Sequence, residues 1–171
     1  MSLAQGLRAT ARDQGGEKLT RDDVTRLWNA TVDQWMLDCV PYRYQGSDPA
    51  TGLDCFQGVV IGLYRIAGID LPDYVHDEQV RQGQRNIGHG ITEQYRDLFC
   101  RVESKPAQVG DVATFVFPHD THAGVMLDQC IVAHAMETVG VCRSRLASLR
   151  RRSVGFQLLR YHGPGADVFQ A

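Results

Sequence analysis

Apolar residues recur every three to four positions between residues 21 and 38, which is the spacing of one face of an α-helix. Thr20 before this stretch is a good N-cap, and Pro41 ends it. A second apolar stripe starts directly after Cys55 and is followed by Gly68, a suitable C-terminal stop. We therefore expect two amphipathic helices in the N-terminal half of the chain.

The second half of the chain changes to short apolar runs separated by turn residues, which is the pattern of β-strands. The runs are 112–117, 122–127, 130–135, 139–141 and 154–161. Between the two halves, the segment 71–105 is interrupted by proline and glycine, and we expect only short helices in parts of 75–83 and 91–99. Helices followed by a meander of strands predict an α+β domain, with the N-terminal helices packed on a central antiparallel sheet of about five strands.

The length of 171 residues suits one domain with its own core, which we place at 20–162. Residues 1–19 are polar and predict a flexible arm, and residues 163–171 predict a loosely held tail. The arm lacks the apolar centre of a secretory signal peptide, and no apolar run reaches membrane-spanning length. We expect a chain made in the cytoplasm, without a signal peptide and without membrane insertion.

A net charge of −2 gives no basic surface of the kind that binds nucleic acid, so we expect no nucleic-acid partner. One basic cluster stands out, formed by Arg143, Arg145 and residues 150–152. Such a cluster is most often a solvated loop or strand edge, and the alternative is a contact with an anionic polymer or a partner.

Five cysteines, at positions 39, 55, 100, 130 and 142, form no Cys-x-x-Cys pair and predict neither a disulfide framework nor a structural zinc site. Four of them have apolar neighbours and are expected to be buried and inert. Cys55 differs because it follows Asp54 at the start of a predicted helix, where the first N–H groups and the helix dipole favour a thiolate. Cys55 is therefore the candidate nucleophile.

His122 and His134 lie in two successive predicted strands, one hairpin apart. If the fold brings them to Cys55, one can act as a base and the other can orient it, although histidines in strands are often structural. His119 and His122 also form a His-x-x-His pair that Cys55 could complete as a zinc site. Because residues i and i+3 of a strand point to opposite faces, we expect no metal, and no cofactor is expected.

Five short motifs carry a family resemblance that spans roughly residues 25–161. The motifs are Tyr42-Arg43-Tyr44-Gln45-Gly46, Gly52-Leu53-Asp54-Cys55, Pro106-Ala107-Gln108-Val109-Gly110-Asp111, His122-Ala123-Gly124-Val125 and Val132-Ala133-His134-Ala135. Together they resemble the NlpC-type cell-wall cysteine peptidases, a papain-like family. The stretch 69–74 is similar to the branch of that family encoded with phage tails. The resemblance implies a papain-like, NlpC-type fold.

The resemblance also implies roles for individual residues. The implied catalytic set is the nucleophile Cys55, the base His122 and the orienting residue His134. Tyr42 matches a tyrosine near the oxyanion hole of the family, with Tyr44 as its competitor and as an expected substrate contact. Asp54 matches an acid that helps to bind the amine end of the peptidoglycan stem peptide.

The sequence departs from the family directly after the nucleophile. The family usually continues with Ser-Gly, whereas this chain has Phe56 and Gln57. The backbone N–H of the nucleophile, which contributes to the oxyanion hole, does not depend on this side chain. The contacts made by the serine are lost, so we expect the departure to change peptide specificity more than the chemistry.

The function implied is that of a cysteine peptidase or amidase that cleaves peptidoglycan stem peptides, typically between D-γ-glutamate and a diamino acid. The implied partners are peptidoglycan peptides and phage tail proteins, with delivery to the cell wall as part of a phage-like particle. Two alternatives stay open: a catalytically silent tail or assembly protein with the same fold, and another papain-like acyl-transfer enzyme. Thiol reactivity separates the silent protein from the two enzymes, and product analysis on muropeptides separates the enzymes from each other.

Overall fold

The structure is a computed structural model that describes residues 18–74 and 87–170, and its fold is α+β. The α-helices are Arg21–Leu37 (α2), Ile61–Ile66 (α3), Ile87–Gln94 (α5) and Leu146–Arg152 (α6), with a π-helix at Cys55–Val60 (η1) and a 3₁₀-helix at Ala166–Phe169 (η2). The strands are Ser47–Asp48 (β1), Gly52–Leu53 (β2), Phe99–Arg101 (β3), Val112–Phe117 (β4), Asp120–Met126 (β5), Ile131–Met136 (β6), Gly140–Arg145 (β7) and Gly155–Tyr161 (β8). No helix among the described residues is long and apolar enough to cross a bilayer.

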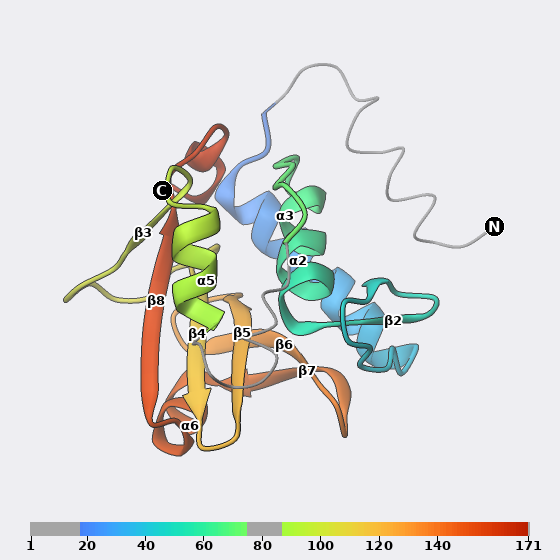
Figure 1. The fold of residues 1–171 in the computed structure, drawn as a ribbon. Coiled ribbons are helices and arrows are strands. Elements are labelled where there is room, and N and C mark those ends of the chain that lie inside the picture. The colour runs from blue at the N-terminus through green and yellow to red at the C-terminus, as the bar shows by residue number, and fades with distance from the viewer. Residues whose placement is uncertain (1–17, 75–86, 171) are drawn as a thin grey trace.

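The strands β3 to β8 form one antiparallel sheet in the order β3-β8-β4-β5-β6-β7, and β1 pairs with β2 in a separate small ribbon (Figure 1). The main sheet has six strands, one more than the expected five. The additional strand is β3, which follows α5 in the segment where only short helices were expected. It pairs with the edge of β8, and Phe99 at its start is buried.

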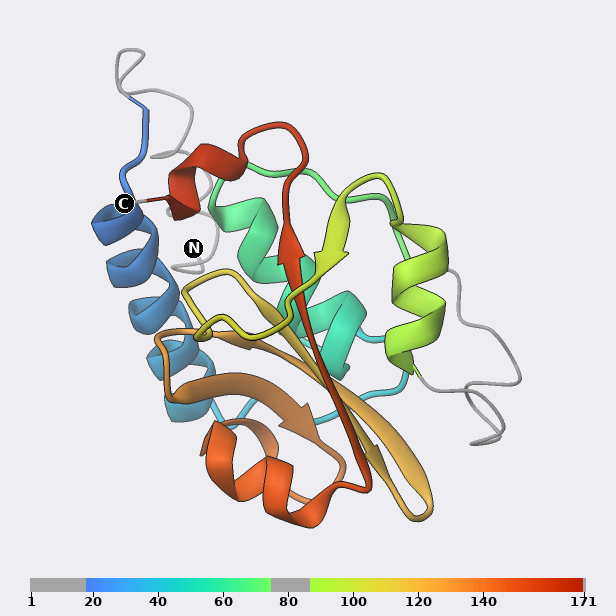
Figure 2. The same cartoon turned by 90° about the vertical axis from the view of Figure 1, so that its left-hand side faces the viewer.

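Helices cover both faces of the sheet (Figure 2). Neighbouring residues of a strand point to opposite faces, so Val125 packs in the core under α2 and α3 while Met126 packs in a smaller core under α6. Leu149 is the buried residue of α6 in that smaller core. The sequence prediction of a loop or strand edge at 150–152 is therefore wrong, because these arginines form the last turn of a helix whose apolar side covers the sheet.

The two N-terminal helices agree with the predicted positions. The first begins with a capping box, in which the Thr20 hydroxyl accepts from the Asp23 N–H and the Asp23 carboxylate accepts from the Thr20 N–H. It ends at Leu37, before Cys39 turns the chain with a positive φ of 52°. The second helix starts at Cys55 as expected, but its first turn is a π-helix that continues into α3.

The C-terminal segment differs from the expectation of a loosely held tail. Val168 and Phe169 are buried, and the Phe169 ring packs against Trp28 of α2 and Tyr64 of α3. Two apolar residues are too few to give a periodic sequence signal, which explains why this packing was not predicted. Residues 1–17 of the expected N-terminal arm and residue 171 lie outside the described part of the chain.

A buried ion pair fixes the entry to β4. Asp111 is fully buried, and its two carboxylate oxygens each accept from the guanidinium of Arg160 on β8 at 2.8 Å. The same carboxylate accepts from the Gln108 N–H at 2.9 Å, which closes the turn before the strand. The preceding Gly110 has a φ of 90°, a backbone conformation that glycine adopts without strain. This pair joins two neighbouring strands of the central sheet.

Candidate active site

Cys55 begins the π-helix η1, and Asp54 caps it. The Asp54 carboxylate accepts from the Gly58 N–H at 2.8 Å, and the Asp54 carbonyl accepts from the Val59 N–H at 3.0 Å. The second bond spans five residues, so the first turn is wider than an α-helical turn. Asp54 thereby satisfies two successive N–H groups of the helix start and fixes the direction in which the next residue, Cys55, leaves the backbone.

Close backbone contacts bring Tyr42 to Cys55. Leu53, just before the helix, exchanges backbone hydrogen bonds with Pro41 and Arg43 on either side of Tyr42. At Gly58 an added Cβ would lie 2.5 Å from the carbonyl oxygen of Gly46, so only glycine permits this approach of loop and helix. The loop holds Tyr42 beside the helix start for this reason.

The histidines stand where strands β5 and β6 separate. β5 pairs with β4 along six residue pairs, but with β6 only at Val125 and Met126. The N-terminal half of β5 therefore leaves backbone groups available, and the Ala123 N–H interacts with the Cys55 sulfur. His122, next to Ala123, reaches toward β6, where its Nε2 lies 2.8 Å from Nδ1 of His134.

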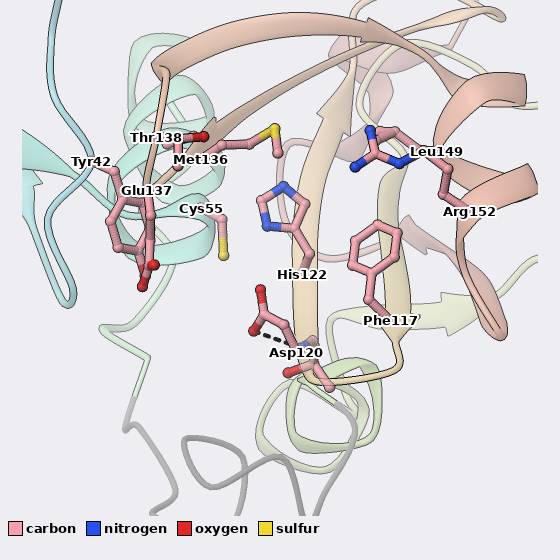
Figure 3. Close-up of a pocket in the computed structure, with 12 residues that line it drawn as sticks. Tyr42, Cys55, Phe117, Asp120, His122, Met136, Glu137, Thr138, Leu149 and Arg152 are labelled. Atoms are coloured by element: carbon pink, nitrogen blue, oxygen red, sulfur yellow. Dashed lines mark hydrogen bonds between the residues drawn. The ribbon is translucent and has the colours of Figure 1, made fainter.

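A pocket of about 320 Å³ opens at this end of the sheet (Figure 3). Cys55, His122 and Tyr42 project into it, and both Cys55 and His122 are more than nine-tenths buried. The remaining lining residues come from the β4–β5 hairpin, the β6–β7 turn and α6: Phe117, Asp120, Thr121, Ala135, Met136, Glu137, Thr138, Leu149 and Arg152. His134 is fully buried behind His122. The structure thus gathers four of the six predicted site residues.

The hydrogen bonds define which nitrogen of His122 faces the nucleophile. Since Nε2 is bonded to His134, only Nδ1 remains for Cys55. His134 in turn contacts the Ser144 hydroxyl through its own Nε2 at 2.8 Å. When each histidine donates from Nε2 along this line, Nδ1 of His122 carries no proton and can accept the thiol proton. The arrangement can therefore serve a thiol–imidazole reaction.

Burial sets the protonation states of this pair. Burial, followed by the charge of Asp54, raises the pKa of Cys55 above its ordinary value, although the N–H groups of Ala123 and Cys55 act in the opposite direction. Burial, followed by the proximity of His134, lowers the pKa of His122. The resting pair at neutral pH is a thiol and a neutral imidazole. The expected advantage of a helix start for the thiolate is therefore outweighed by desolvation.

Tyr44 and Asp54 lie outside the pocket lining. Tyr44 is exposed, and Asp54 is buried beneath the helix start, where it acts as the cap. Their contacts with a substrate stay predictions. Phe56, at the position where the family has serine, also points away from the pocket, because it is fully buried and packs against Tyr74 and Tyr95. The residue that replaces the serine of the motif is therefore part of the hydrophobic core.

The segment 71–105 does not line the pocket with any of its described residues. Its first part is attached to the helix start instead: the side chain of Gln57 donates to the Asp73 carboxylate and accepts from the Tyr74 N–H. The described part of this segment is therefore attached to the helix that begins at Cys55 without lining the pocket. Residues 75–86 lie outside the described residues.

The expected burial of the other four cysteines is wrong for three of them. Cys39, Cys100 and Cys130 are exposed, and Cys142 is half-buried beside His134. Among the described residues, no three His, Cys, Asp or Glu side chains are grouped as a metal site, and the His119–His122 pair has no third ligand. Because three cysteines are exposed, thiol labelling of the native protein would reflect the exposure of each cysteine more than its chemical reactivity.

A Cys55-only protein, with the other four cysteines changed to serine, should react with iodoacetamide at a rate that rises steadily with pH from 6 to 9. The reason is that a raised thiol pKa leaves little thiolate at neutral pH. Asp120→Asn should increase the rate at pH 7.5 by roughly threefold to tenfold, since the Asp120 charge is one cause of the raised pKa. Asp97→Asn, an exposed change outside the pocket, is the control, and equal rates in both variants would contradict the assignment.

Ser144 is a site residue that the sequence reasoning missed. The alternation of β7 places Cys142 opposite His134 in register, and Ser144 lies on the same strand face two residues further. Ser144→Ala should lower turnover by roughly threefold to tenfold, the effect of about one hydrogen bond, because it frees the outer nitrogen of His134. Ser148→Ala on α6 is the matched control. An unchanged kcat, measured by peptide hydrolysis across pH 5 to 9, would remove Ser144 from the site.

Comparison with known proteins gives a structural match only. No protein-family model and no curated protein matches the sequence. A crystal structure of a protein from Staphylococcus aureus subsp. aureus Mu50, described as similar to lipoprotein, NLP/P60 family, matches with a TM-score of 0.52 and 19% sequence identity. The two share a fold. The match covers 85% of this chain and 44% of that protein, so this chain spans less than half of its length. The NLP/P60 fold agrees with the α+β architecture expected from the sequence, and the phage-tail branch stays a prediction.

Proposed function

We propose that this protein is a cysteine hydrolase that cleaves amide bonds in peptidoglycan stem peptides, between D-γ-glutamate and a diamino acid. The observation that carries the proposal is that Cys55 and His122 share one pocket of an NLP/P60-type fold, with His134 hydrogen-bonded to His122. A thiol, a neutral imidazole with one free nitrogen and a second histidine behind it are the groups that acyl transfer requires.

The reaction begins when Cys55 attacks the amide carbonyl and its proton passes to Nδ1 of His122. The sulfur–carbon bond forms, and the carbonyl oxygen takes the negative charge. The carbon–nitrogen bond then breaks, and the leaving amine takes the proton from His122, which leaves a thioester on Cys55. Water, deprotonated by His122, hydrolyses the thioester and restores the thiol.

Two donors support the negative charge on the oxygen. The first is the backbone N–H of Cys55 at the helix start. The second is the Tyr42 hydroxyl, whose pKa is raised by burial and next by the neighbouring Cys55. A hydroxyl with a raised pKa keeps its proton at neutral pH and can donate a hydrogen bond. His134 holds His122 in the ring orientation and tautomer that the first step needs.

Cys55→Ala should abolish cleavage of purified muropeptides while the protein stays folded, since alanine is compatible with a helix start and the side chain is small. Wild type and variant are compared on several muropeptide types, with the products identified by mass spectrometry. Cys142→Ala is the matched control, because this thiol is close to His134 but does not line the pocket. Identical product spectra for wild type and Cys55→Ala would favour a catalytically silent protein with this fold.

A further inference from the structure

The pocket holds opposite charges at different ends. Asp120 and Glu137 lie on the side of Cys55 and Tyr42, whereas the Arg152 side chain extends over the pocket from the far side of His122 (Figure 3). Burial raises the pKa of Asp120, and the charge of Glu137 raises it further. Their charge is not neutralised by Arg152, since neither carboxylate forms an ion pair with it among the described residues.

Arg152 differs from the other arginines of the basic cluster. Arg143 binds the Asp33 carboxylate and Asn29 of α2, and Arg150 stacks on the Phe156 ring with its guanidinium carbon 4.7 Å from the centroid. Arg151 is exposed and does not line the pocket. Arg152 is also exposed, but it lines the pocket, and no hydrogen bond or ion pair joins its side chain to another described residue. A guanidinium aimed at a catalytic pocket without a protein partner is available to a ligand.

We propose that Arg152 binds a carboxylate of the substrate that flanks the scissile amide. This inference rests on the proposed function and adds a specificity-determining residue to it. A guanidinium matches a carboxylate with two parallel hydrogen bonds, which selects by geometry as well as by charge. Asp120 and Glu137 repel a carboxylate from the other end of the pocket, so the two charged ends orient the peptide across His122.

The substrate of the proposed function offers such a carboxylate. A γ-linked glutamyl residue keeps its α-carboxylate free beside the amide that is cleaved, so it offers the group that Arg152 recognises. The same peptide with an α-carboxamide has nearly the same shape but no negative charge. The pocket should therefore distinguish γ-glutamyl peptides with a free α-carboxylate from their amidated forms.

The test compares this pair of peptides on wild type, Arg152→Gln, Arg152→Lys and the control Arg151→Gln. Wild type should cleave the carboxylate peptide with a kcat/KM about tenfold higher than the carboxamide, the range of one charged hydrogen-bonded contact near solvent. Arg152→Gln should lower only the rate on the carboxylate peptide and remove the preference. Arg152→Lys should keep part of it, and Arg151→Gln should keep all of it. Thermal unfolding checks that each variant is folded.

A preference that survives in Arg152→Gln, or that is lost equally in Arg151→Gln, would overturn the inference while leaving the hydrolase itself intact. Binding of both peptides to the Cys55→Ala protein, measured by calorimetry with and without Arg152→Gln, separates recognition from turnover. If wild type cleaves neither peptide, the proposed function fails. In that case the inference about Arg152 stands only if the Cys55→Ala protein binds the carboxylate peptide more tightly than the carboxamide peptide and Arg152→Gln removes this difference. Equal binding of the two peptides would overturn it.

Discussion

His122→Ala should lower the kcat for stem-peptide hydrolysis by about a hundredfold to ten-thousandfold, the contribution of a positioned general base. The effect is large because the resting nucleophile is a neutral thiol, so attack requires a proton acceptor at the moment of reaction. His122 is the imidazole that shares the pocket with Cys55, and its lowered pKa keeps it unprotonated at neutral pH. The measurement is single-turnover kinetics on a purified γ-glutamyl peptide.

The matched control for this variant is His119→Ala, a histidine in the β4–β5 hairpin that does not line the pocket. The double variant Cys55→Ala with His122→Ala should be no slower than the single Cys55→Ala variant, because the two residues act as a unit. A loss below tenfold in His122→Ala would mean that another group accepts the thiol proton. The pH profile sharpens the test: the acid limb of kcat/KM should lie well below the ordinary pKa of histidine.

Arg160→Met should lower the free energy of unfolding by about 3 kcal/mol, which is in the range for breaking a buried ion pair by removing one partner. The reason is that Asp111 is fully buried and would lose the two 2.8 Å hydrogen bonds that it accepts from the guanidinium. Methionine retains most of the aliphatic volume, so the loss reports the missing charge. Chemical denaturation followed by circular dichroism measures it.

Arg101→Met on the neighbouring strand β3 is the control, because this arginine is exposed and should change stability by less than about 0.5 kcal/mol. The double variant with Asp111→Leu should be more stable than Arg160→Met alone, since it removes the unpaired carboxylate. Equal effects of the two single arginine variants would show that the pair contributes little to the fold. The pocket around Cys55 includes neither Arg160 nor Asp111, so we expect the activity per folded molecule to stay the same.

Local patterns in the sequence predicted the elements that carry the site. The helical spacing before Cys39 and the apolar stripe after Cys55 predicted two helices near their observed bounds. The short apolar runs that contain His122 and His134 predicted two adjacent strands in the same way. Period-two alternation also implies that residues two apart share a strand face, which is how Ser144 could have been found. The connection between Cys55 and His122 came from the family resemblance, because no local pattern reports which distant segments meet.

The remaining features depend on long-range packing. The separation of β5 from β6, which leaves the Ala123 N–H available to the Cys55 sulfur, has no signature in the sequence of either strand. Helix α6 is too short to show periodicity, so Arg152 could not be assigned to a pocket. The apolar sequence neighbours of Cys39, Cys100 and Cys130 predicted burial, but all three are exposed. A residue next to apolar side chains in the sequence can still lie on the outer face of a strand or at a turn.

The π-helix at Cys55–Val60 makes the length of this segment as important as its composition. Each residue of an α-helix turns the chain by about 100°, so losing one residue from the wide turn would rotate the start of the helix by that angle relative to α3. Every side chain of the site would still be present, yet the sulfur would face a different direction from the imidazole. Substitutions and deletions in this turn are therefore different kinds of change. A substitution between Phe56 and Val60 alters packing, whereas the deletion of one residue there alters the direction in which the Cys55 side chain points.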